Sequence, residues 1–469
     1  MGTAFHIENF GCRAARADGE AVGERLRASG LVEDQPSVAD VVIVNTCSVT
    51  AEADRSARAF IRRAHRLNPD ARILVTGCYA QRAPDELARM DGVAAVVGNS
   101  HKALAPEIAI RLAAEVSEPL HPQPAQGFVP VRSLLADSSQ GATPVWVDDR
   151  FAHSFLEEAQ LIPGGQTRPN LKIQEGCGNR CTFCVIPQTR GHSRSLPPDA
   201  VLAQVRGFVA AGGKELVLSG INLGRWGRDL PAEGARPSLA RLVRRIVEET
   251  ELPRMRLSSI EPMDWDTELM AVIHDYSGSR IARHAHLPLQ SGSDSVLRRM
   301  HRRYRPWHYE EKVGALLEAF GPGLTLGADI MVGFPGETDR EFGETCKMIR
   351  DVPFGYLHIF PFSPRPGTSA WSMHLEAAVP PAVVAERREI LVTLDRDKTR
   401  SHRVEFIGGS FDAITLHTPE RWKNRGRTPA LTDNFLPVEL EGEFEANRFT
   451  RIRVNGIASD LTLTSVAEG

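Results

Sequence analysis

The stretch that decides the fold is Glu175-Gly176-Cys177-Gly178-Asn179-Arg180-Cys181-Thr182-Phe183-Cys184, which spaces three cysteines as Cys-x3-Cys-x2-Cys. It follows directly on the strand candidate Leu171–Gln174. Three thiolates on one loop can hold one metal centre, because soft thiolate ligands select zinc, Cu(I) or iron–sulfur clusters. A [4Fe–4S] cluster with three protein ligands leaves one iron open to substrate or cofactor. Structural zinc is the alternative, with His192 as the nearest fourth ligand at a poor spacing.

Outward from this loop, strand and helix patterns alternate from about Leu171 to Asp395. Six strands are predicted at Leu171–Gln174, Glu215–Gly220, Met255–Glu261, His284–Gln290, Leu324–Gly333 and Tyr356–Ser363. Helices are predicted between them at Asp199–Ala211, Ser238–Glu249, Trp265–His274, Tyr309–Phe320 and Asp339–Arg350. Six βα units in series predict a partial TIM barrel with its chemistry at the carboxyl ends of the strands. A six-unit doubly wound sheet is the alternative.

The first hundred residues also alternate strand and helix patterns. Strands are predicted at Thr3–Phe10, Val41–Val44 and Arg72–Val75, and helices at Asp18–Ser29 and Ala51–Leu67. Short apolar strands that alternate with helices are typical of a doubly wound parallel sheet.

A cysteine follows each of these three strands, at Cys12, Cys47 and Cys78. All strands of an open parallel sheet end at the same edge, where ligands gather. A single cysteine at such a place is often only a buried residue. Three cysteines at equivalent positions instead predict a shared metal or cluster site, although periodicity does not say which metal.

Two further regions complete the predicted organisation. Residues 116–165 are rich in Pro and Gly and are predicted to be a linker or crossover. It separates an amino-terminal domain at 1–115 from the barrel domain at 166–398. Residues 399–469 are predicted to form a small all-β barrel, with strands at Val404–Phe406, Phe411–Leu416, Leu436–Leu440 and Phe449–Val454.

Composition narrows the class of protein. The chain has 469 residues, of which 42% are hydrophobic and 25% charged, and its net charge is −3. A uniformly basic nucleic-acid coat is therefore excluded, but local basic patches are not. No apolar run has the length of a membrane span, and the first residues do not form a signal peptide, so we expect a cytoplasmic protein. Its seven cysteines are too sparse for a disulfide scaffold.

The central cysteine loop, with an aromatic residue before its last cysteine, resembles the signature of radical S-adenosylmethionine (SAM) enzymes. The resemblance implies that Cys177, Cys181 and Cys184 hold a [4Fe–4S] cluster whose open iron binds SAM. Reductive cleavage of SAM then gives methionine and a 5′-deoxyadenosyl radical. Further motifs match the same barrel and imply cofactor contacts from Phe183, Ser219, Gly220, Asn222, Ser259, Glu261, Gln290 and Gly333.

The order of three regions resembles the methylthiotransferases within that superfamily. There the amino-terminal cysteines, here Cys12, Cys47 and Cys78, hold a second [4Fe–4S] cluster that carries sulfur, and a TRAM module contacts RNA. The motifs around Cys47 and Cys78 resemble most the MtaB branch, which methylthiolates C2 of N6-threonylcarbamoyladenosine at position 37 of transfer RNA. This chain departs from the family at Ala15, where Asn is usual, and it matches TRAM only through Thr432–Val438.

Basic residues cluster in the terminal region. Its segment Arg421-Trp422-Lys423-Asn424-Arg425-Gly426-Arg427 interleaves an aromatic ring with cations, which suits phosphate contact and base stacking. We therefore predict RNA binding by Arg421, Trp422, Lys423, Arg425 and Arg427, with the anticodon loop as partner. The arginines of 55–66 are interpreted as a solvated helix face. For Arg298, Arg299, Arg302 and Arg303, substrate contact and an exposed helix end are both open.

The sequence therefore predicts a tRNA methylthiotransferase that has two [4Fe–4S] clusters, uses SAM and needs an electron donor such as flavodoxin or ferredoxin. Its sulfur donor is open. The rival substrates are isopentenyladenosine in tRNA and a ribosomal-protein aspartate. A rival of another class is a non-catalytic RNA-binding protein with structural zinc. Cys346 is interpreted as a bystander, and His358 as a weak active-site candidate.

Overall fold

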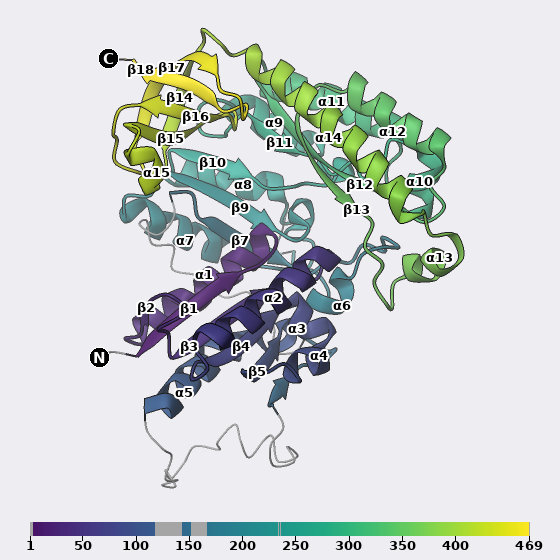
Figure 1. The fold of residues 1–469 in the computed structure, drawn as a ribbon. Coiled ribbons are helices and arrows are strands. Elements are labelled where there is room, and N and C mark those ends of the chain that lie inside the picture. The colour runs from purple at the N-terminus through teal and green to yellow at the C-terminus, as the bar shows by residue number, and fades with distance from the viewer. Residues whose placement is uncertain (1–2, 118–142, 152–166, 233, 235, 469) are drawn as a thin grey trace. The chain divides into compact units, whose positions relative to one another are not determined.

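The computed structural model describes residues 3–117, 143–151, 167–232, 234 and 236–468 (Figure 1). They group into two compact units. Unit 1 comprises 1–157 together with two short segments, 176–178 and 185–192. Unit 2 comprises 158–175, 179–184 and 193–469. Most of the predicted linker 116–165 lies outside the described residues, and its described part includes the short strand β6.

Unit 1 is built on a six-stranded parallel sheet of order β2-β1-β3-β4-β5-β6. The strands are β1 (Ala4–Asn9), β2 (Val32–Glu33), β3 (Val41–Thr46), β4 (Arg72–Gly77), β5 (Val93–Gly98) and β6 (Val145–Trp146). The predicted doubly wound parallel sheet is confirmed. The order turns back between β1 and β3, and such a switch point is where open α/β sheets bind ligands.

Helices cover both faces of this sheet because its strands are apolar on both sides. Val42 and Val44 face a core that holds Phe60 and Ile61 of α2 (Ala51–Leu67). Val41 and Ile43 face the opposite core, with α1 (Arg13–Ala28) and α5 (Ala105–Ser117). The remaining helical elements are α3 (Cys78–Arg82), α4 (Pro84–Ala88), the 3₁₀ turn η1 (Asn99–Leu104) and α6 (Ile186–Arg190).

The central part of unit 2 contains all six predicted strands, arranged as a partial barrel. They are β7 (Asn170–Glu175), β9 (Glu215–Gly220), β10 (Arg254–Leu257), β11 (His284–His286), β12 (Thr325–Val332) and β13 (Phe354–Pro361). One sheet has the order β10-β9-β7-β8, in which β8 (Arg194–Ser195) is a short antiparallel edge, and the other has the order β11-β12-β13. A hydrogen bond from the Ile260 amide to His286 O links β10 to β11. This arrangement confirms the barrel and excludes the doubly wound alternative.

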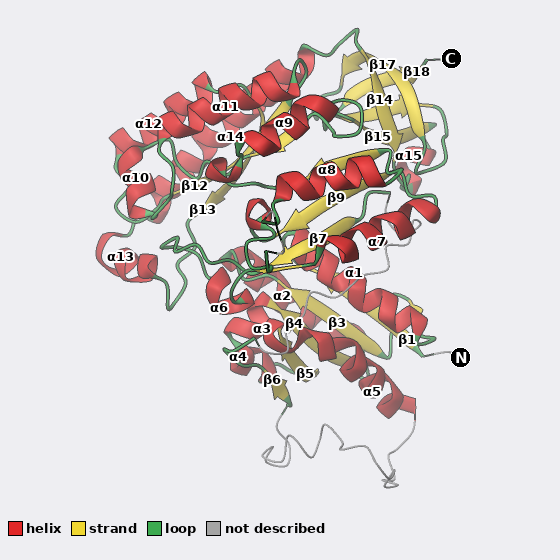
Figure 2. Cartoon of the chain, turned by 180° about the vertical axis from the view of Figure 1, so that it is seen from behind, coloured by secondary structure: helices red, strands yellow, loops and turns green. Residues whose placement is uncertain are grey.

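Helices line the outer face of these strands (Figure 2). They are α7 (Pro198–Ala210), α8 (Leu239–Glu249), α9 (Thr267–Tyr276), α10 (Asp294–Arg299), α11 (Pro306–Phe320), α12 (Asp339–Asp351) and α14 (Pro381–Val404). Helix α13 (Ser369–Ala377) stands apart from the strands, and unit 2 also has the 3₁₀ turns η3 (Leu223–Arg225) and η4 (Pro262–Asp264). Among the described residues, none of the helices has the length and apolar character that a membrane crossing requires.

The carboxy-terminal region is a closed barrel of five strands, which confirms the predicted small all-β barrel. Its elements are β14 (Ser410–Thr415), α15 (Glu420–Lys423), β15 (Arg427–Thr432), β16 (Pro437–Glu441), β17 (Phe449–Ile457) and β18 (Leu463–Ala467). The strand predicted at Val404–Phe406 is wrong. Val404 is the last residue of the 24-residue helix α14, and Phe406 lies in the turn before Gly408, whose φ is +89°.

The TRAM-like segment Thr432–Val438 lies against the amino ends of the partial-barrel strands. Arg256 of β10 donates hydrogen bonds to the backbone carbonyls of Thr432 (2.6 Å) and Asp433 (3.0 Å), and it also pairs with Glu215 (2.6 Å). The ring of Phe435 stacks on His284 at a centroid distance of 4.1 Å. This segment therefore joins the terminal barrel to the central one.

Candidate functional site

In unit 1, the three amino-terminal cysteines lie at the carboxyl ends of three neighbouring strands. Cys12 caps the amino end of α1 two residues beyond Phe10, Cys47 follows β3, and Cys78 begins α3 directly after β4. Gly11 permits a close approach, because a Cβ at this position would lie 2.3 Å from Cys47 Cβ and 2.7 Å from its Sγ. Its φ of +105° also favours glycine. The predicted gathering of thiols at one sheet edge is therefore present.

The surroundings of Cys12 and Cys47 favour the protonated thiol over the free thiolate. Burial, together with the neighbouring Cys78 and Cys12, raises the pKa of Cys47 to about 12. Cys12 retains exposed surface but is crowded by protein atoms, and this desolvation raises its pKa, while Arg190 acts in the opposite direction. Three thiolates at this edge therefore require positive charge beside them, which a bound metal centre supplies.

N–H groups point at the sulfur atoms. The Cys78 Sγ accepts hydrogen bonds from Asn99 Nδ2 (3.3 Å) and Arg190 Nε (3.2 Å). The amide of Val49 lies 3.5 Å from Cys47 Sγ. Three thiolate donors with N–H groups directed at sulfur match the chemistry of iron–sulfur ligation. The residues present therefore fit a cluster at this edge.

The departure at Ala15 lies close to this site. Ala15 is buried in the first turn of α1, and its carbonyl accepts a short hydrogen bond from Asn45 Nδ2. The same amide group donates to Asn9 Oδ1 at 2.9 Å. Asn45 is the second-to-last residue of β3. Its side chain therefore links β1, β3 and α1 without an amide side chain at position 15.

The second cysteine set lies on the loop after β7, and each of its members is partly exposed. The amide of Cys177 donates to Gly191 O (3.1 Å) in unit 1. In unit 2, the amide of Cys184 donates to Cys181 O (3.1 Å), and Thr182 Oγ1 donates to Arg299 O (2.9 Å). The donor set is again three soft thiolates, so it also fits an iron–sulfur cluster.

A buried arginine also contacts this second set. Arg302 donates from Nη1 to Cys181 Sγ (3.3 Å) and from Nη2 to Glu261 Oε2 (2.6 Å). Burial opposes its charge, but Tyr304, Glu261 and Cys181 together raise the pKa of Arg302 well above its ordinary value. The guanidinium therefore links the sulfur of Cys181 to Glu261, a predicted cofactor residue.

The other predicted cofactor residues lie at or just beyond the carboxyl ends of the barrel strands. Ser219 and Gly220 end β9, and the amide of Asn222 donates to Gln174 Oε1 at 2.7 Å. Ser259 and Glu261 follow β10. Phe183 is half-buried beside Cys184. The structure thus brings these residues to the edge at which barrels of this kind carry their chemistry.

Gln290 and Gly333 both have a left-handed backbone conformation at the same edge. Gln290 has a φ of +64°, unusual for a residue with a side chain, and its buried Oε1 has no hydrogen-bond partner among the described residues. Gly333 has a φ of +76°, and a Cβ there would lie 2.5 Å from Val384 Cγ2. An unpartnered buried acceptor at a strained position is typical of a residue that meets a ligand.

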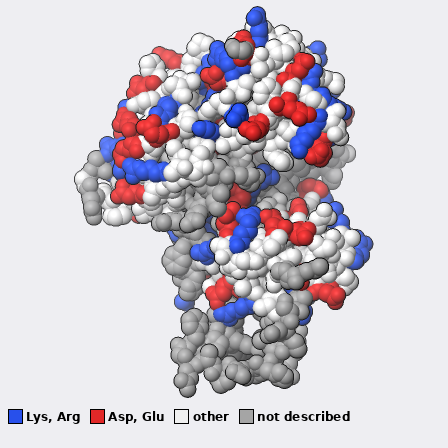
Figure 3. Space-filling model, turned by 90° about the vertical axis from the view of Figure 1, so that its left-hand side faces the viewer, with Lys and Arg blue, Asp and Glu red and all other residues white. Residues whose placement is uncertain are grey.

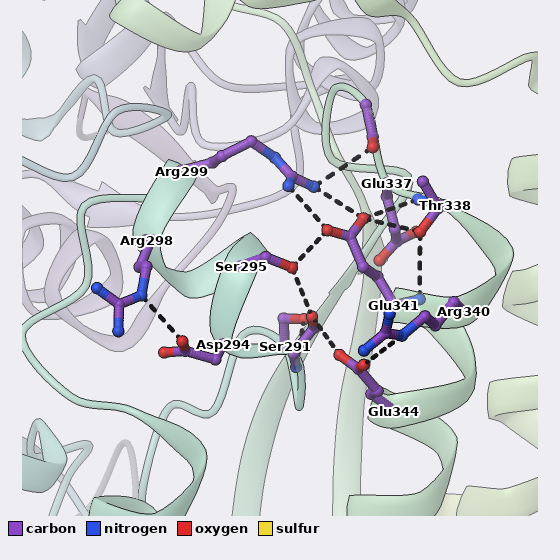
Figure 4. Close-up of polar contacts among 12 residues, drawn as sticks. Ser291, Asp294, Ser295, Arg298, Arg299, Glu337, Thr338, Arg340, Glu341 and Glu344 are labelled. Atoms are coloured by element: carbon purple, nitrogen blue, oxygen red, sulfur yellow. Dashed lines mark hydrogen bonds and ion pairs between the residues drawn. The ribbon is translucent and has the colours of Figure 1, made fainter.

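The polar residues that follow these turns mainly hold the barrel together (Figure 4). Thr338 and Glu341 form a capping box at the start of α12. Glu341 also accepts hydrogen bonds from Ser295 and from Arg299 at 2.8 and 2.9 Å. Burial tends to raise the pKa of Glu341, but Arg299 and Ser295 lower it to about 2. Helix α10 is thereby fixed to α12.

The arginines of 298–303 are all paired with carboxylates. Arg298 pairs with Asp294, Arg299 with Glu341, Arg302 with Glu261 and Arg303 with Asp264. For Arg298, Arg299 and Arg303 these ion pairs favour a role in the local structure, whereas Arg302 also contacts Cys181. On the face in Figure 3, Lys and Arg are interspersed with Asp and Glu, which agrees with the balanced net charge.

The predicted RNA-binding segment lies on α15 and the start of β15. Arg421, Lys423 and Arg425 are exposed, and Trp422 and Arg427 are half-buried. Lys423 pairs with Glu420 at 2.9 Å, and Arg427 lies 3.8 Å from Glu441. The segment is thus accessible, with its tryptophan beside exposed cations.

Sequence reasoning missed one polar cluster inside the partial barrel. His286, Asp329 and His358 lie on the adjacent strands β11, β12 and β13, with their ligand atoms within 4.8 Å of one another. Desolvation tends to raise the pKa of Asp329, but the imidazoles of His286 (3.5 Å) and His358 (3.3 Å) hold it well below its usual range. Their positions in successive predicted strands were the available signal. Their proximity follows only from the strand register, in which Asp329 pairs with His358.

Two family models match the chain. Residues 4–98 match a model described as Uncharacterized protein family UPF0004, and residues 171–349 match the Radical SAM superfamily. Among solved structures, the chain resembles the radical SAM methyltransferase TsrM from Kitasatospora setae, with a TM-score of 0.53, 14% identity and coverage of 79% of this chain and 75% of that one. The fold and the cysteine loop thus define a radical SAM enzyme.

Curated relatives narrow the family. The chain is 34% identical to the threonylcarbamoyladenosine tRNA methylthiotransferase MtaB of Bacillus subtilis, with coverage of 94% of this chain and 90% of the relative. It is also 34% identical to MtaB of Aquifex aeolicus (97% and 100%). The tRNA-2-methylthio-N(6)-dimethylallyladenosine synthase of Geobacter metallireducens is 33% identical (98% of each chain). The chain belongs to the methylthiotransferase family of radical SAM enzymes, in its MtaB branch, and works with SAM and [4Fe–4S] clusters.

Proposed function

We propose that this enzyme inserts a methylthio group at C2 of N6-threonylcarbamoyladenosine at position 37 of tRNA, in the anticodon loop. The observation that carries the proposal is the presence of two three-thiol sites in one chain. One site lies at the switch point of a doubly wound sheet, and the other lies on the first loop of a partial barrel. The tRNA substrate is the one named for the MtaB relatives.

The six cysteines are assigned as cluster ligands. Cys12, Cys47 and Cys78 hold the sulfur-carrying cluster, and Cys177, Cys181 and Cys184 hold the cluster that binds SAM. When bound, the second cluster and SAM supply the deoxyadenosyl radical needed to open an aromatic C–H bond, which acid–base chemistry does not activate. The protein's own part is to orient these groups and to exclude side reactions.

Individual residues of unit 2 provide this orientation. Arg302 fixes Glu261 and holds the sulfur of Cys181 by a hydrogen bond. The buried acceptor of Gln290 is available to a bound cofactor. Ser219, Gly220, Asn222, Ser259 and Gly333 shape the rest of the SAM site, and Phe183 lies beside the adenine.

RNA contact is assigned to the terminal barrel. Exposed cations of Arg421, Lys423 and Arg425 bind phosphate, Arg427 adds a further cation, and the ring of Trp422 offers a surface for base stacking. The domain boundaries at 115, 166 and 399 stay predictions. The electron donor is proposed to be a flavodoxin or ferredoxin.

Isopentenyladenosine is the second candidate substrate, because the Geobacter relative named for that base is 33% identical to this chain. Mass spectrometry of tRNA nucleosides from a strain lacking the gene separates the two. We expect loss of the 2-methylthio-threonylcarbamoyl nucleoside, restored by the intact gene and not by one encoding Cys181→Ala. Loss of the 2-methylthio-isopentenyl nucleoside alone assigns the other base, and an unchanged profile of both refutes tRNA methylthiolation.

A further inference from the structure

Arg190 is a fully buried cation at the amino-terminal cysteine site. It ends the short helix α6, six positions after Cys184, and packs within unit 1. Its side chain has no exposed surface. Charged side chains are rarely buried to this degree without a specific partner. The contacts of Arg190 therefore indicate the role of its side chain.

The guanidinium of Arg190 faces sulfur on one side and a carboxylate on the other. Its Nε lies 3.2 Å from Cys78 Sγ, and its Nη1 lies 3.0 Å from Asp18 Oδ2. Asp18 in turn accepts a hydrogen bond from Lys102 Nζ at 3.2 Å. Because the guanidinium is planar and held at two of its edges, its charge is fixed in place beside the sulfur.

The backbone before Arg190 is held by the same site. Asn99 donates one hydrogen bond from Nδ2 to Thr189 O (2.9 Å) and one to Cys78 Sγ (3.3 Å). A single amide group therefore connects the end of α6 to the sulfur that Arg190 contacts. This second attachment fixes Arg190 relative to Cys78 from the main-chain side.

The charge of Arg190 lies beside the amino-terminal cysteine set. It contacts Cys78 directly, and Cys78 lies at the same sheet edge as Cys12 and Cys47. A fixed cation and an N–H···S hydrogen bond both stabilise added negative charge on a thiolate-bound cluster. The reduced form of such a cluster carries one more negative charge than the oxidised form.

We propose that Arg190 is a positioning residue of the amino-terminal cluster, which orients the Cys78 thiolate and raises the reduction potential of the cluster bound there. The proposal rests on the proposed function only in taking Cys12, Cys47 and Cys78 as cluster ligands. It also means that the chain segment carrying the last cysteine of one cluster supplies the buried cation of the other.

Redox titration of the anaerobically reconstituted full-length enzyme, followed by electron paramagnetic resonance, tests this role. Arg190→Gln removes the charge and keeps an N–H donor, whereas Arg190→Lys keeps the charge. We expect the midpoint potential of the amino-terminal cluster to move negative in Arg190→Gln and to move less in Arg190→Lys, with the barrel cluster unchanged. The matched control is Arg302→Lys, which alters the corresponding cation–sulfur contact at the other site.

The opposing results are distinct. Equal shifts in the two Arg190 variants, or no shift in either, would overturn the proposal. If Arg190→Gln fails to bind its cluster, the midpoint potential of Arg190→Lys decides. A potential more negative than that of the wild type supports the proposal, and an unchanged potential overturns it. The titration uses no tRNA, so a failed nucleoside assay leaves it intact, and the iron content of the wild-type enzyme shows beforehand whether both clusters are present.

Discussion

The two cysteine sites reach the same donor set by opposite routes. In unit 1, three strands far apart in sequence each end at one cysteine, and two of these thiols are buried. On the loop after β7, three cysteines lie within eight residues of one another in sequence and are all partly exposed. The first site depends on the complete sheet, whereas the second depends on local spacing. Each nevertheless has one buried arginine that donates to one sulfur atom.

The largest expected effect is a difference in activity between variants that lack one or the other cysteine set. Replacing Cys177, Cys181 and Cys184 by Ala removes the site for SAM, so we expect both SAM cleavage and methylthiolation to be lost. Replacing Cys12, Cys47 and Cys78 by Ala abolishes methylthiolation but leaves cleavage. Liquid chromatography of 5′-deoxyadenosine measures cleavage, and Cys346→Ala, at a buried cysteine of α12, is the control. Continued SAM cleavage without the barrel cysteines contradicts this division.

A difference in thiol reactivity is the next effect. In the cluster-free protein at pH 8, a pKa of about 12 leaves Cys47 almost entirely protonated. We expect its alkylation to be about a thousandfold slower than that of an ordinary thiol, since the thiolate is the nucleophile. The partly exposed Cys177, Cys181 and Cys184 react first. Peptide mass spectrometry after timed iodoacetamide treatment measures the order, and early labelling of Cys47 would show that the buried site opens.

A third test asks whether a buried arginine away from the cysteines has a purely structural role. Arg256 pairs with Glu215, and both side chains are fully buried. Arg256→Met leaves the Glu215 carboxylate with Arg254 (3.2 Å) and removes a donor from the carbonyls of Thr432 and Asp433, so we expect a loss of about 3 kcal/mol in the free energy of unfolding. Urea unfolding measures it. A loss below about 1 kcal/mol, the size of an exposed pair, argues against the anchoring role.

The smallest effect is a pH dependence in unit 2. Burial, with Arg403 nearby, lowers the pKa of His402 from 6.5 to about 4. The unfolded chain takes up a proton as the pH falls below 6.5, while the folded chain keeps this imidazole neutral until about pH 4. Stability from this group is therefore present above pH 6.5 and is lost as the pH falls towards 4. His402→Gln should reduce the pH dependence of the melting temperature in that window, and an unchanged pH dependence contradicts the assignment.

The sequence predicted the elements that follow from local pattern. All six barrel strands and the ends of α2 at Ala51 and Leu67 agree with the structure. The cysteine positions were predictable because each thiol follows an apolar strand. β15 escaped because Pro429 lies within it, and proline is unusual inside a strand. Val404–Phe406 misled because β-branched and aromatic residues occur where α14 ends.

The missed site features depend on long-range contacts. Arg190 and Cys78 are distant in sequence, and nothing in the pattern around α6 indicates that this side chain points at sulfur. The cluster of His286, Asp329 and His358 depends on strand register. The anchoring of Thr432–Val438 to Arg256 likewise arises only when the two barrels are folded together within unit 2. Local pattern therefore locates ligands, and tertiary packing decides what surrounds them.

Iron and sulfide analysis of the anaerobically reconstituted chain tests the assignment of two clusters most directly. We expect about eight irons and eight sulfides per wild-type chain and about four of each in either triple cysteine variant, because each [4Fe–4S] cluster carries four. Cys346→Ala should keep about eight. A colourless protein with stoichiometric zinc, or a triple variant that retains the full iron content, would contradict two separate three-cysteine clusters.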